Sequence, residues 1–227
     1  MTETLRIEKS VKDGVLHLLR HLLESQKVGA VFALRSLSEN KAGNAMEYSL
    51  ITNVDALDDS SALFPIMPRN AGGLLAQLTQ KGEVPLPVAV FVRPCELRAL
   101  VELAKRNRSN LKDLFVISST CPGVFPTKMM INGELKKNIS GYWDAIKRNK
   151  TPKNIKSTCR ACTEFVPYNS DMTVWVLGQA DIHKECHVSL NSTKAREYAN
   201  GMDGEITDEM QPSDALEKIR KRIRAFT

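Results

Sequence analysis

The sequence lacks several features that mark familiar protein classes. It has no run of about 18 apolar residues, which a membrane-spanning helix requires, so we expect no transmembrane helix. Its N-terminus, MTETLRIEKS, is polar and lacks the apolar stretch of a secretory signal. No GxGxxG motif follows a predicted strand, so a Rossmann-type dinucleotide site is not supported. We therefore expect a cytoplasmic protein, either free or attached to a larger soluble or membrane-associated assembly.

Aromatic residues are also scarce, at 6% of the 227 residues, whereas the net charge is +6. The positive charge is concentrated in segments 105–112, 136–156 and 218–224. Such clusters can bind nucleic acid, an anionic coenzyme or an acidic partner, but nucleic acid is not favoured in a chain so poor in aromatic residues for base stacking. We interpret the clusters mainly as solvated helix faces and a flexible insertion. Segment 136–156 and the C-terminal helix are the candidates for docking a partner or attracting an anionic coenzyme.

The apolar segments predict an α/β fold with a mixed, largely parallel sheet and flanking helices. Leucines recur at helical spacing in residues 15–25, and a short β-branched strand follows at 28–34. Residues 87–95 form a near-continuous apolar run, typical of a strand buried on both faces. A helix with proline and an acid in its first turn follows at 94–106, and another buried strand at 111–121. This order predicts a βαβ unit at 87–121 with parallel strands.

Two regions are predicted, an N-terminal α/β region at 1–85 and a second region at 86–227, which together can form one continuous domain. The further elements expected in the second region are a mobile basic insertion at 127–157 with a short helix at 141–149, a hairpin of strands at 171–178 and 181–190, and a C-terminal amphipathic helix at 213–226.

Five cysteines in a chain of this kind argue against a disulfide framework and for metal or redox chemistry. Cys159 and Cys162 form a CxxC pair, which can be a redox dithiol, half of a zinc site or part of an iron–sulfur cluster. Cys95 and Cys121 lie just past the carboxyl ends of the two strands of the βαβ unit, the edge where cofactors bind in open α/β sheets. Four thiolates are the usual ligands of a cubane cluster, while zinc and dithiol sites stay open as alternatives. Cys186 is interpreted as strand packing.

The segments RPCELRALVELAKRNRSNLKDLFVISSTCPGVFP and CRACTEFVPYNSDMTVWVLG resemble the coenzyme F-420 hydrogenase/dehydrogenase beta-subunit family, which includes the beta subunits of F-420-reducing hydrogenase and of formate dehydrogenase. The similarity is detailed over 88–178 and looser over 10–35. It implies a flavoprotein with FAD and one four-iron four-sulfur cluster. Such a protein relays electrons between a hydride carrier, F-420 or NAD(P)H, and a partner's iron–sulfur chain. The partner would be a hydrogenase, a formate dehydrogenase or a heterodisulfide-reductase-like subunit.

The resemblance also implies site residues, although two glycine-bearing segments depart from the family pattern. Backbone amides at two helix starts can hold a flavin phosphate, with an arginine as anion partner, and a simple helix cap is the alternative. No catalytic residue is predicted. The implied cluster ligands are Cys95, Cys121, Cys159 and Cys162, and the candidate flavin-binding residues are Asp13, Gly14, Arg69, Gly72 and Gly73.

Two arginines flank the predicted cluster ligands. Arg93 and Arg160 are each within two residues of a cysteine, where a positive charge would raise the potential of a cluster, and exposed arginines are the alternative. Three functional hypotheses follow. The first is a flavin- and cluster-bearing electron-transfer subunit. The second is a non-catalytic cluster-bearing assembly subunit without flavin, and the third is a zinc-stabilised basic module that binds nucleic acid.

Overall fold

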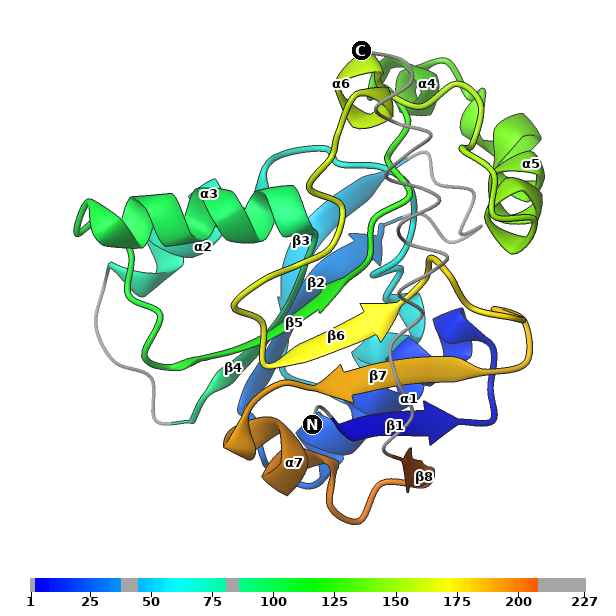
Figure 1. Cartoon of the computed structure of the whole chain (residues 1–227). Helices are drawn as coiled ribbons and strands as arrows, with labels where there is room; N and C mark the ends of the chain where they lie inside the picture. The colour runs from blue at the N-terminus through cyan, green and yellow to red at the C-terminus, as the bar shows by residue number, and fades with distance from the viewer. Residues whose placement is uncertain (1–2, 38–44, 81–85, 208–227) are drawn as a thin grey trace.

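One eight-stranded sheet forms the centre of the molecule (Figure 1). The computed structural model describes residues 3–37, 45–80 and 86–207. The strands lie in the order β3-β2-β4-β5-β6-β7-β1-β8. Their bounds are β1 Glu3–Ile7, β2 Ala30–Ser36, β3 Met46–Ile51, β4 Val88–Val92, β5 Leu114–Ser119, β6 Met172–Trp175, β7 Cys186–Leu190 and β8 Glu205–Thr207.

The sheet is mixed, as predicted. Strands β2, β4, β5 and β6 are mutually parallel and form its centre, and the other strand pairs of the described residues are antiparallel. The parallel strands are thus the four central ones, which are largely buried, as their mostly apolar sequences require. The predicted βαβ unit is confirmed as β4, α3 and β5, and the predicted hairpin as β6 and β7. Strands from both predicted regions share this one sheet.

Helices connect the strands and cover the sheet. Helix α1 packs against β2, β6 and β7 and lies behind the sheet in the view of Figure 1. It buries Leu18, Leu19 and Leu22 completely, and each such leucine contributes about 1.5–3 kcal/mol. The bounds are α1 Val11–Glu24, η1 Asp55–Asp59, α2 Ala71–Thr79, α3 Pro94–Lys105, α4 Lys128–Ile131, α5 Leu135–Lys147, α6 Ser157–Arg160 and α7 Thr193–Ala199.

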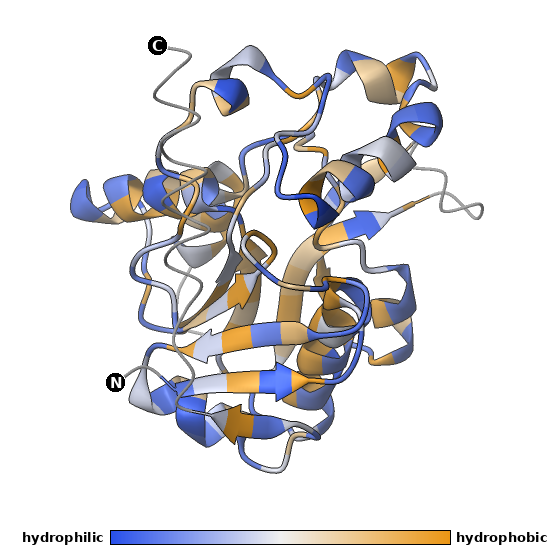
Figure 2. Cartoon of the chain, turned by 45° about the vertical axis from the view of Figure 1, so that its right-hand side comes forward, coloured by the Kyte–Doolittle hydropathy of each residue, from blue (hydrophilic) through white to orange (hydrophobic). Residues whose placement is uncertain are grey.

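The segment between β5 and β6 differs most from its prediction. It folds into α4, α5 and α6, which gather beyond the carboxyl ends of the central strands (Figure 1). Helix α5 is longer than the predicted helix and buries Leu135, Tyr142, Trp143 and Ile146. These positions are i, i+7, i+8 and i+11, the spacing of one helical face. The prediction of a poorly packed insertion is therefore wrong, because a narrow apolar stripe runs through a lysine-rich sequence. Hydrophobic and hydrophilic residues mix accordingly in these helices (Figure 2).

The predicted C-terminal helix at 213–226 lies outside the described residues. Within the described ranges, no helix combines the length and the apolar character needed to cross a bilayer.

Candidate functional site

Four cysteines lie beyond the carboxyl ends of the central strands. Cys95 is in the first turn of α3, directly after β4, and Cys121 follows the end of β5 by two residues. Cys159 lies in the short helix α6, and Cys162 follows it. Parallel strands end at a common edge, and the four residues are brought to the same end of the molecule for that reason.

Backbone hydrogen bonds hold the CxxC loop over the loop that follows β5. The amide of Cys121 donates to the carbonyl of Phe165 over 2.8 Å, and the amide of Lys156 donates to the carbonyl of Val124 over 2.8 Å. A Cβ built on Gly123 would lie 3.1 Å from the Cβ of Cys159. Residues far apart in the sequence therefore form one compact cysteine-bearing structure.

Three of the thiols share one hollow. Cys121, Cys159 and Cys162 line a small pocket of about 40 Å³. Although Cys121 is partly accessible, burial of its thiol raises its pKa to about 12, and the positive charge of Arg93 opposes that rise. Cys95 keeps contact with solvent, yet burial raises its pKa too, and the charges of Cys159 and Cys162 add to the effect. The four thiols therefore influence one another electrostatically.

This donor set differs from that of a single-ion site. Among the described residues, no three Cys, His, Asp or Glu side chains stand close enough together to ligate one metal ion. The zinc alternative therefore has no ligand set in that part of the chain. A four-iron cluster is larger than one ion, and each iron takes one thiolate, so its ligands stand further apart. The four thiols have the ligand type that such a cluster takes, and three of them line one pocket.

Arg93 is buried beneath the edge of the sheet beyond which the four cysteines lie. It is 6% exposed, so the exposed-arginine interpretation is wrong for this residue. Its guanidinium donates to the hydroxyl of Tyr48 (2.8 Å) and to the backbone carbonyls of Phe64 (2.6 Å) and Ile66 (2.8 Å). It also forms a buried ion pair with Glu96 at 3.4 Å. Arg93 thus links β4, next to Cys95, to the segment that precedes α2.

Glu96 is the acceptor at the centre of this network. It is fully buried and follows Cys95 directly. Its carboxylate accepts hydrogen bonds from the Tyr48 hydroxyl (2.6 Å), the Arg93 amide (2.9 Å) and the Ala71 amide (3.2 Å). Buried charges of this kind are stable only when they are paired. Glu96 therefore fixes the first turn of α3, which carries Cys95.

Asp13 and Gly14 lie within the first turn of α1 rather than at its start. The helix begins at Val11 and is capped by Ser10, whose Oγ accepts from the Asp13 amide over 3.2 Å. The Gly14 amide donates to the Ser10 carbonyl over 2.7 Å. A Cβ on Gly14 would lie 2.4 Å from the Cβ of Cys186 in β7. This geometry favours the helix-cap alternative, with Gly14 allowing close contact between helix and strand.

The other predicted flavin residues surround the start of α2. The Gly72 amide donates to the capping side chain of Asn70 over 2.9 Å, and a Cβ on Gly72 would lie 2.6 Å from the Glu96 carbonyl oxygen. Gly72 therefore serves the contact between α2 and α3. Arg69 and Gly73 are exposed. The five predicted residues thus divide between the starts of two separate helices.

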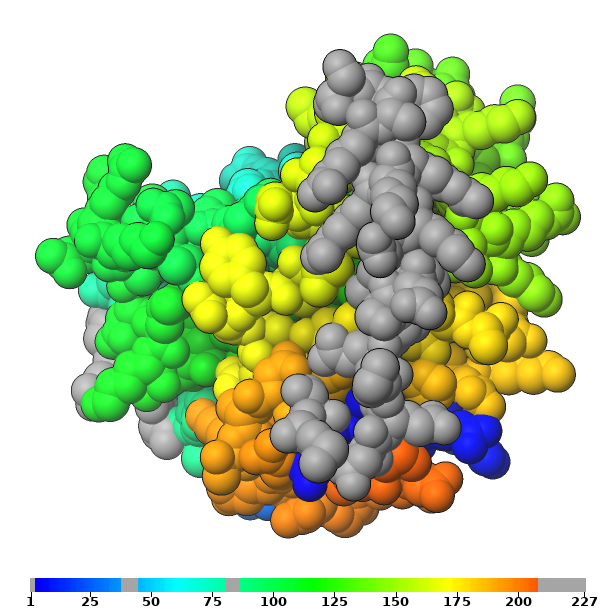
Figure 3. All heavy atoms as spheres, in the orientation of Figure 1, coloured from blue at the N-terminus to red at the C-terminus, as the bar shows by residue number. Residues whose placement is uncertain are grey.

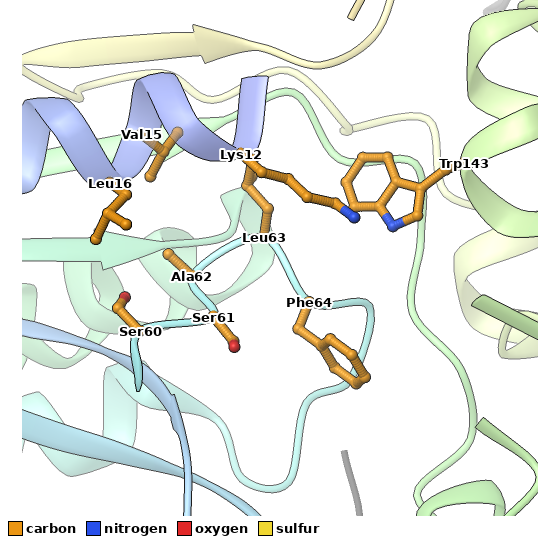
Figure 4. Close-up of a pocket in the computed structure, with 9 residues that line it drawn as sticks. All are labelled: Lys12, Val15, Leu16, Ser60, Ser61, Ala62, Leu63, Phe64 and Trp143. Atoms are coloured by element: carbon orange, nitrogen blue, oxygen red, sulfur yellow. The ribbon is translucent and has the colours of Figure 1, made fainter. Parts of the chain in front are cut away.

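A pocket that sequence reasoning missed opens beside the first turn of α1, and we call it the Lys12 pocket (Figure 4). It holds about 170 Å³. Its walls are Lys12, Val15 and Leu16 of α1, residues 60–64, and Trp143 of α5. The Nζ of Lys12 lies 4.4 Å from the centroid of the Trp143 indole. Partial burial lowers the pKa of Lys12, and Asp13 opposes this shift.

The Lys12 pocket is a neighbour of the cysteine pocket. A narrow hollow lies between them, lined by Leu63 and Trp143 from the Lys12 pocket, by Cys121 from the cysteine pocket, and by Arg93. The hydroxyl of Tyr142 donates to the carbonyl of Gly123 over 2.8 Å, which joins α5 to the cysteine loop. No sequence motif reveals this arrangement, because Lys12 and Trp143 meet only through the fold.

The fold and the cysteine loops define a class, an α/β protein with its candidate cofactor site at the carboxyl edge of a mixed sheet. No family model matches the sequence. The sequence is similar to the beta subunit of F420-dependent formate dehydrogenase 1 from Methanococcus maripaludis, at 24% identity over an alignment that covers 84% of this chain and 54% of the relative. It is also similar to the beta subunit of F420-dependent formate dehydrogenase from Methanocaldococcus jannaschii, at 29% identity over 110 residues, 48% of this chain and 27% of that subunit.

A solved structure shares the fold. A chain of the F420-reducing [NiFe] hydrogenase complex from Methanosarcina barkeri superposes with a TM-score of 0.64 at 13% identity, covering 100% of this chain and 90% of that chain. The two sequence relatives confirm the resemblance to F-420 hydrogenase/dehydrogenase beta subunits that the cysteine pattern predicts. The chain spans about half the length of the M. maripaludis subunit.

Proposed function

We propose that the chain is an electron-transfer subunit of a multi-subunit oxidoreductase, which passes electrons between a hydride carrier, F-420 or NAD(P)H, and a redox partner. It would hold FAD and one four-iron four-sulfur cluster, in the cytoplasm or in a membrane-associated complex. The observation that carries this proposal is that three cysteines share one pocket, while Cys95 lies in the first turn of α3 and feels the charges of Cys159 and Cys162. The named relatives, beta subunits of F420-dependent formate dehydrogenases, support it.

When bound, the flavin would supply two-electron hydride chemistry and the cluster one-electron transfer. Cys95, Cys121, Cys159 and Cys162 are the residues that would hold the cluster. The chain's own contribution is to fix these ligands and to set their electrostatic surroundings. Arg93 does both, because it is buried in the network beneath the edge and its charge acts on the Cys121 thiol.

The cap formed by α4, α5 and α6 is the proposed docking surface for the partner. Residues 128–160 contain nine Lys and Arg residues against two acids, a net charge of +7, whereas the whole chain carries +6. Eight of the nine cations are exposed, and none forms an ion pair with another described residue. Lys150 and Arg160 line the cysteine pocket itself. This surface, yellow-green in Figure 3, would attract an acidic face of a redox partner toward the cysteines.

The second hypothesis, a cluster-bearing assembly subunit without flavin, is favoured by one observation. The amides of Asp13 and Gly14, which the resemblance assigns to the flavin, are used inside α1. Flavin content therefore separates the two hypotheses.

The test is the composition of the protein purified without oxygen. Four irons and one flavin per chain, with a brown colour and an electron paramagnetic resonance signal after reduction, support the first hypothesis. Four irons without flavin select the assembly subunit. A colourless protein that contains one zinc contradicts both.

A further inference from the structure

The buried ion pair of Arg93 and Glu96 lies beneath the cysteine edge, and its two charges act on different cysteines. Arg93 is 6% exposed, Glu96 is fully buried, and the charged groups are 3.4 Å apart. Arg93 lines the same narrow hollow as Cys121. Glu96 follows Cys95 directly in the first turn of α3. The pair therefore presents a positive charge beside Cys121 and a negative charge beside Cys95.

The two thiols respond to the pair in opposite ways. Burial raises the pKa of the Cys121 thiol to about 12, and the positive charge of Arg93 opposes that rise. Burial raises the pKa of Cys95 as well, but there the carboxylate of Glu96 adds to the rise by more than Arg93 opposes it. The pair thus stabilises a negative charge at Cys121 and destabilises one at Cys95.

Hydrogen bonds keep the two charges in place, and burial keeps them effective. The hydroxyl of Tyr48 bridges the pair, since it accepts from the Arg93 guanidinium over 2.8 Å and donates to the Glu96 carboxylate over 2.6 Å. Salt screens exposed charges much more strongly than buried ones. Arg160, the other arginine near the cysteines, is exposed. A fixed, poorly screened dipole is therefore a property of the Arg93–Glu96 pair and not of Arg160.

We propose that the Arg93–Glu96 pair polarises the cysteine site, so that an electron added to a bound cluster is stabilised at the Cys121 end and repelled at the Cys95 end. This inference rests on the proposed function, because it requires a bound cluster. One electron from a reductant lowers the charge of the cluster by one, so Arg93 raises the midpoint potential and Glu96 lowers it. Cys95 is exposed, whereas Cys121 lines the inner hollow. The added charge is thereby favoured on the inner side of the site.

The test is a redox titration of the full chain purified with its cluster in the absence of oxygen. Dithionite supplies the electrons, and the electron paramagnetic resonance signal of the reduced cluster is followed against the solution potential. Glu96→Gln removes the negative charge and keeps the size of the side chain, and Arg93→Met removes the positive charge. A double variant removes both charges. Arg93→Lys keeps the positive charge, and Arg160→Met removes an exposed charge between Cys159 and Cys162 as the control.

We expect Glu96→Gln to raise the midpoint potential and Arg93→Met to lower it, because each leaves the other charge buried and unpaired. The double variant should return toward the wild type, and Arg93→Lys should lie closer to the wild type than Arg93→Met does. Arg160→Met should shift the potential less than either single change in the pair. If Arg93→Met fails to fold, Glu96→Gln and the double variant still decide, because they differ only in the charge of Arg93.

Two outcomes overturn the inference. Glu96→Gln and Arg93→Met shift the potential in the same direction, which would show that they only loosen the site, or the Glu96→Gln potential differs from the wild type and from the double variant by no more than Arg160→Met does. The proposed function fails in a different way, because a wild-type chain purified without oxygen would then contain no iron. An iron-bearing chain whose potential does not respond to the pair contradicts the polarisation alone.

Discussion

The amide nitrogen of Cys121 donates to the carbonyl oxygen of Phe165 over 2.8 Å and so joins the exit of β5 to the loop after Cys162. This contact holds together two parts of the chain that are about 40 residues apart. It brings the CxxC pair to the sheet edge where Cys95 also lies. The proposed cluster site therefore depends on three segments, the first turn of α3, the loop after β5 and the region of the CxxC pair, and each can be tested separately.

Replacing any one of the four edge cysteines should abolish the cluster. We expect Cys95→Ser, Cys121→Ser, Cys159→Ser and Cys162→Ser to lose most of the bound iron and the broad visible absorbance, because each iron of the cluster requires its thiolate. Iron quantification of the anaerobic protein measures this. Cys186→Ala is the control, since Cys186 is fully buried in β7 beneath α1, and it should keep the iron of the wild type.

The sequence predicted the central part of the fold well, for a physical reason. Strand β4 and the first four residues of β5 are apolar and nearly all buried, and the proline at the start of α3 marks the turn after β4. The length and the packing of helix α5 were underestimated because its apolar residues are few and lie among lysines. Local composition suggested a segment that is hard to pack, whereas Tyr142 of α5 is buried and donates a hydrogen bond to the carbonyl of Gly123.

The candidate site was predicted only in part. Cysteine thiolates are common metal and redox ligands, so Cys95 and Cys121 could be identified as candidates from their residue type. Lys12 and Trp143 are ordinary residue types separated by more than half of the chain, and only the fold brings them to one pocket. Gly14 and Gly72 were assigned to a ligand because glycine at a helix start suggests phosphate binding. The contacts show that both glycines allow close packing.

Arg93→Met should destabilise the protein strongly. The substitution leaves the Glu96 carboxylate buried without its ion-pair partner and removes hydrogen bonds to two backbone carbonyls, so we expect a loss of about 3–5 kcal/mol in the free energy of unfolding. Urea denaturation of the metal-free chain measures it. Arg160→Met is the matched control, because Arg160 is exposed and should change stability by less than about 0.5 kcal/mol. Equal stability of the two variants would contradict the structural role of Arg93.

Gly14→Ala should destabilise the contact between α1 and β7. The added methyl group would lie 2.4 Å from the Cβ and 2.8 Å from the Sγ of Cys186, so helix and strand must separate. We expect a loss of about 1–3 kcal/mol in the free energy of unfolding, measured by urea denaturation. Gly73→Ala is the control, since nothing lies within 4 Å of its added Cβ. That substitution should be neutral or should stabilise α2 by up to about 1 kcal/mol through helix propensity.

Charge reversal on the α4–α6 cap should weaken electron exchange with an acidic partner. We expect the double variant Lys150→Glu/Lys153→Glu to slow electron transfer to an acidic iron–sulfur ferredoxin by roughly tenfold at low ionic strength, because both lysines are exposed near the cysteine pocket. The difference should shrink as salt screens the charges, over a Debye length of about 8 Å near physiological ionic strength. Stopped-flow absorbance measures the rate.

The control for this experiment is the double variant Arg106→Glu/Arg108→Glu. These two arginines are exposed too, but they follow the far end of α3, which lies about 15 Å along the helix from Cys95. The double variant changes the net charge of the chain by the same amount without altering the cap. If docking depends on where the charges lie, only the cap variant slows the reaction. If both variants slow it equally, the ferredoxin responds to net charge alone, and the cap is not the docking surface.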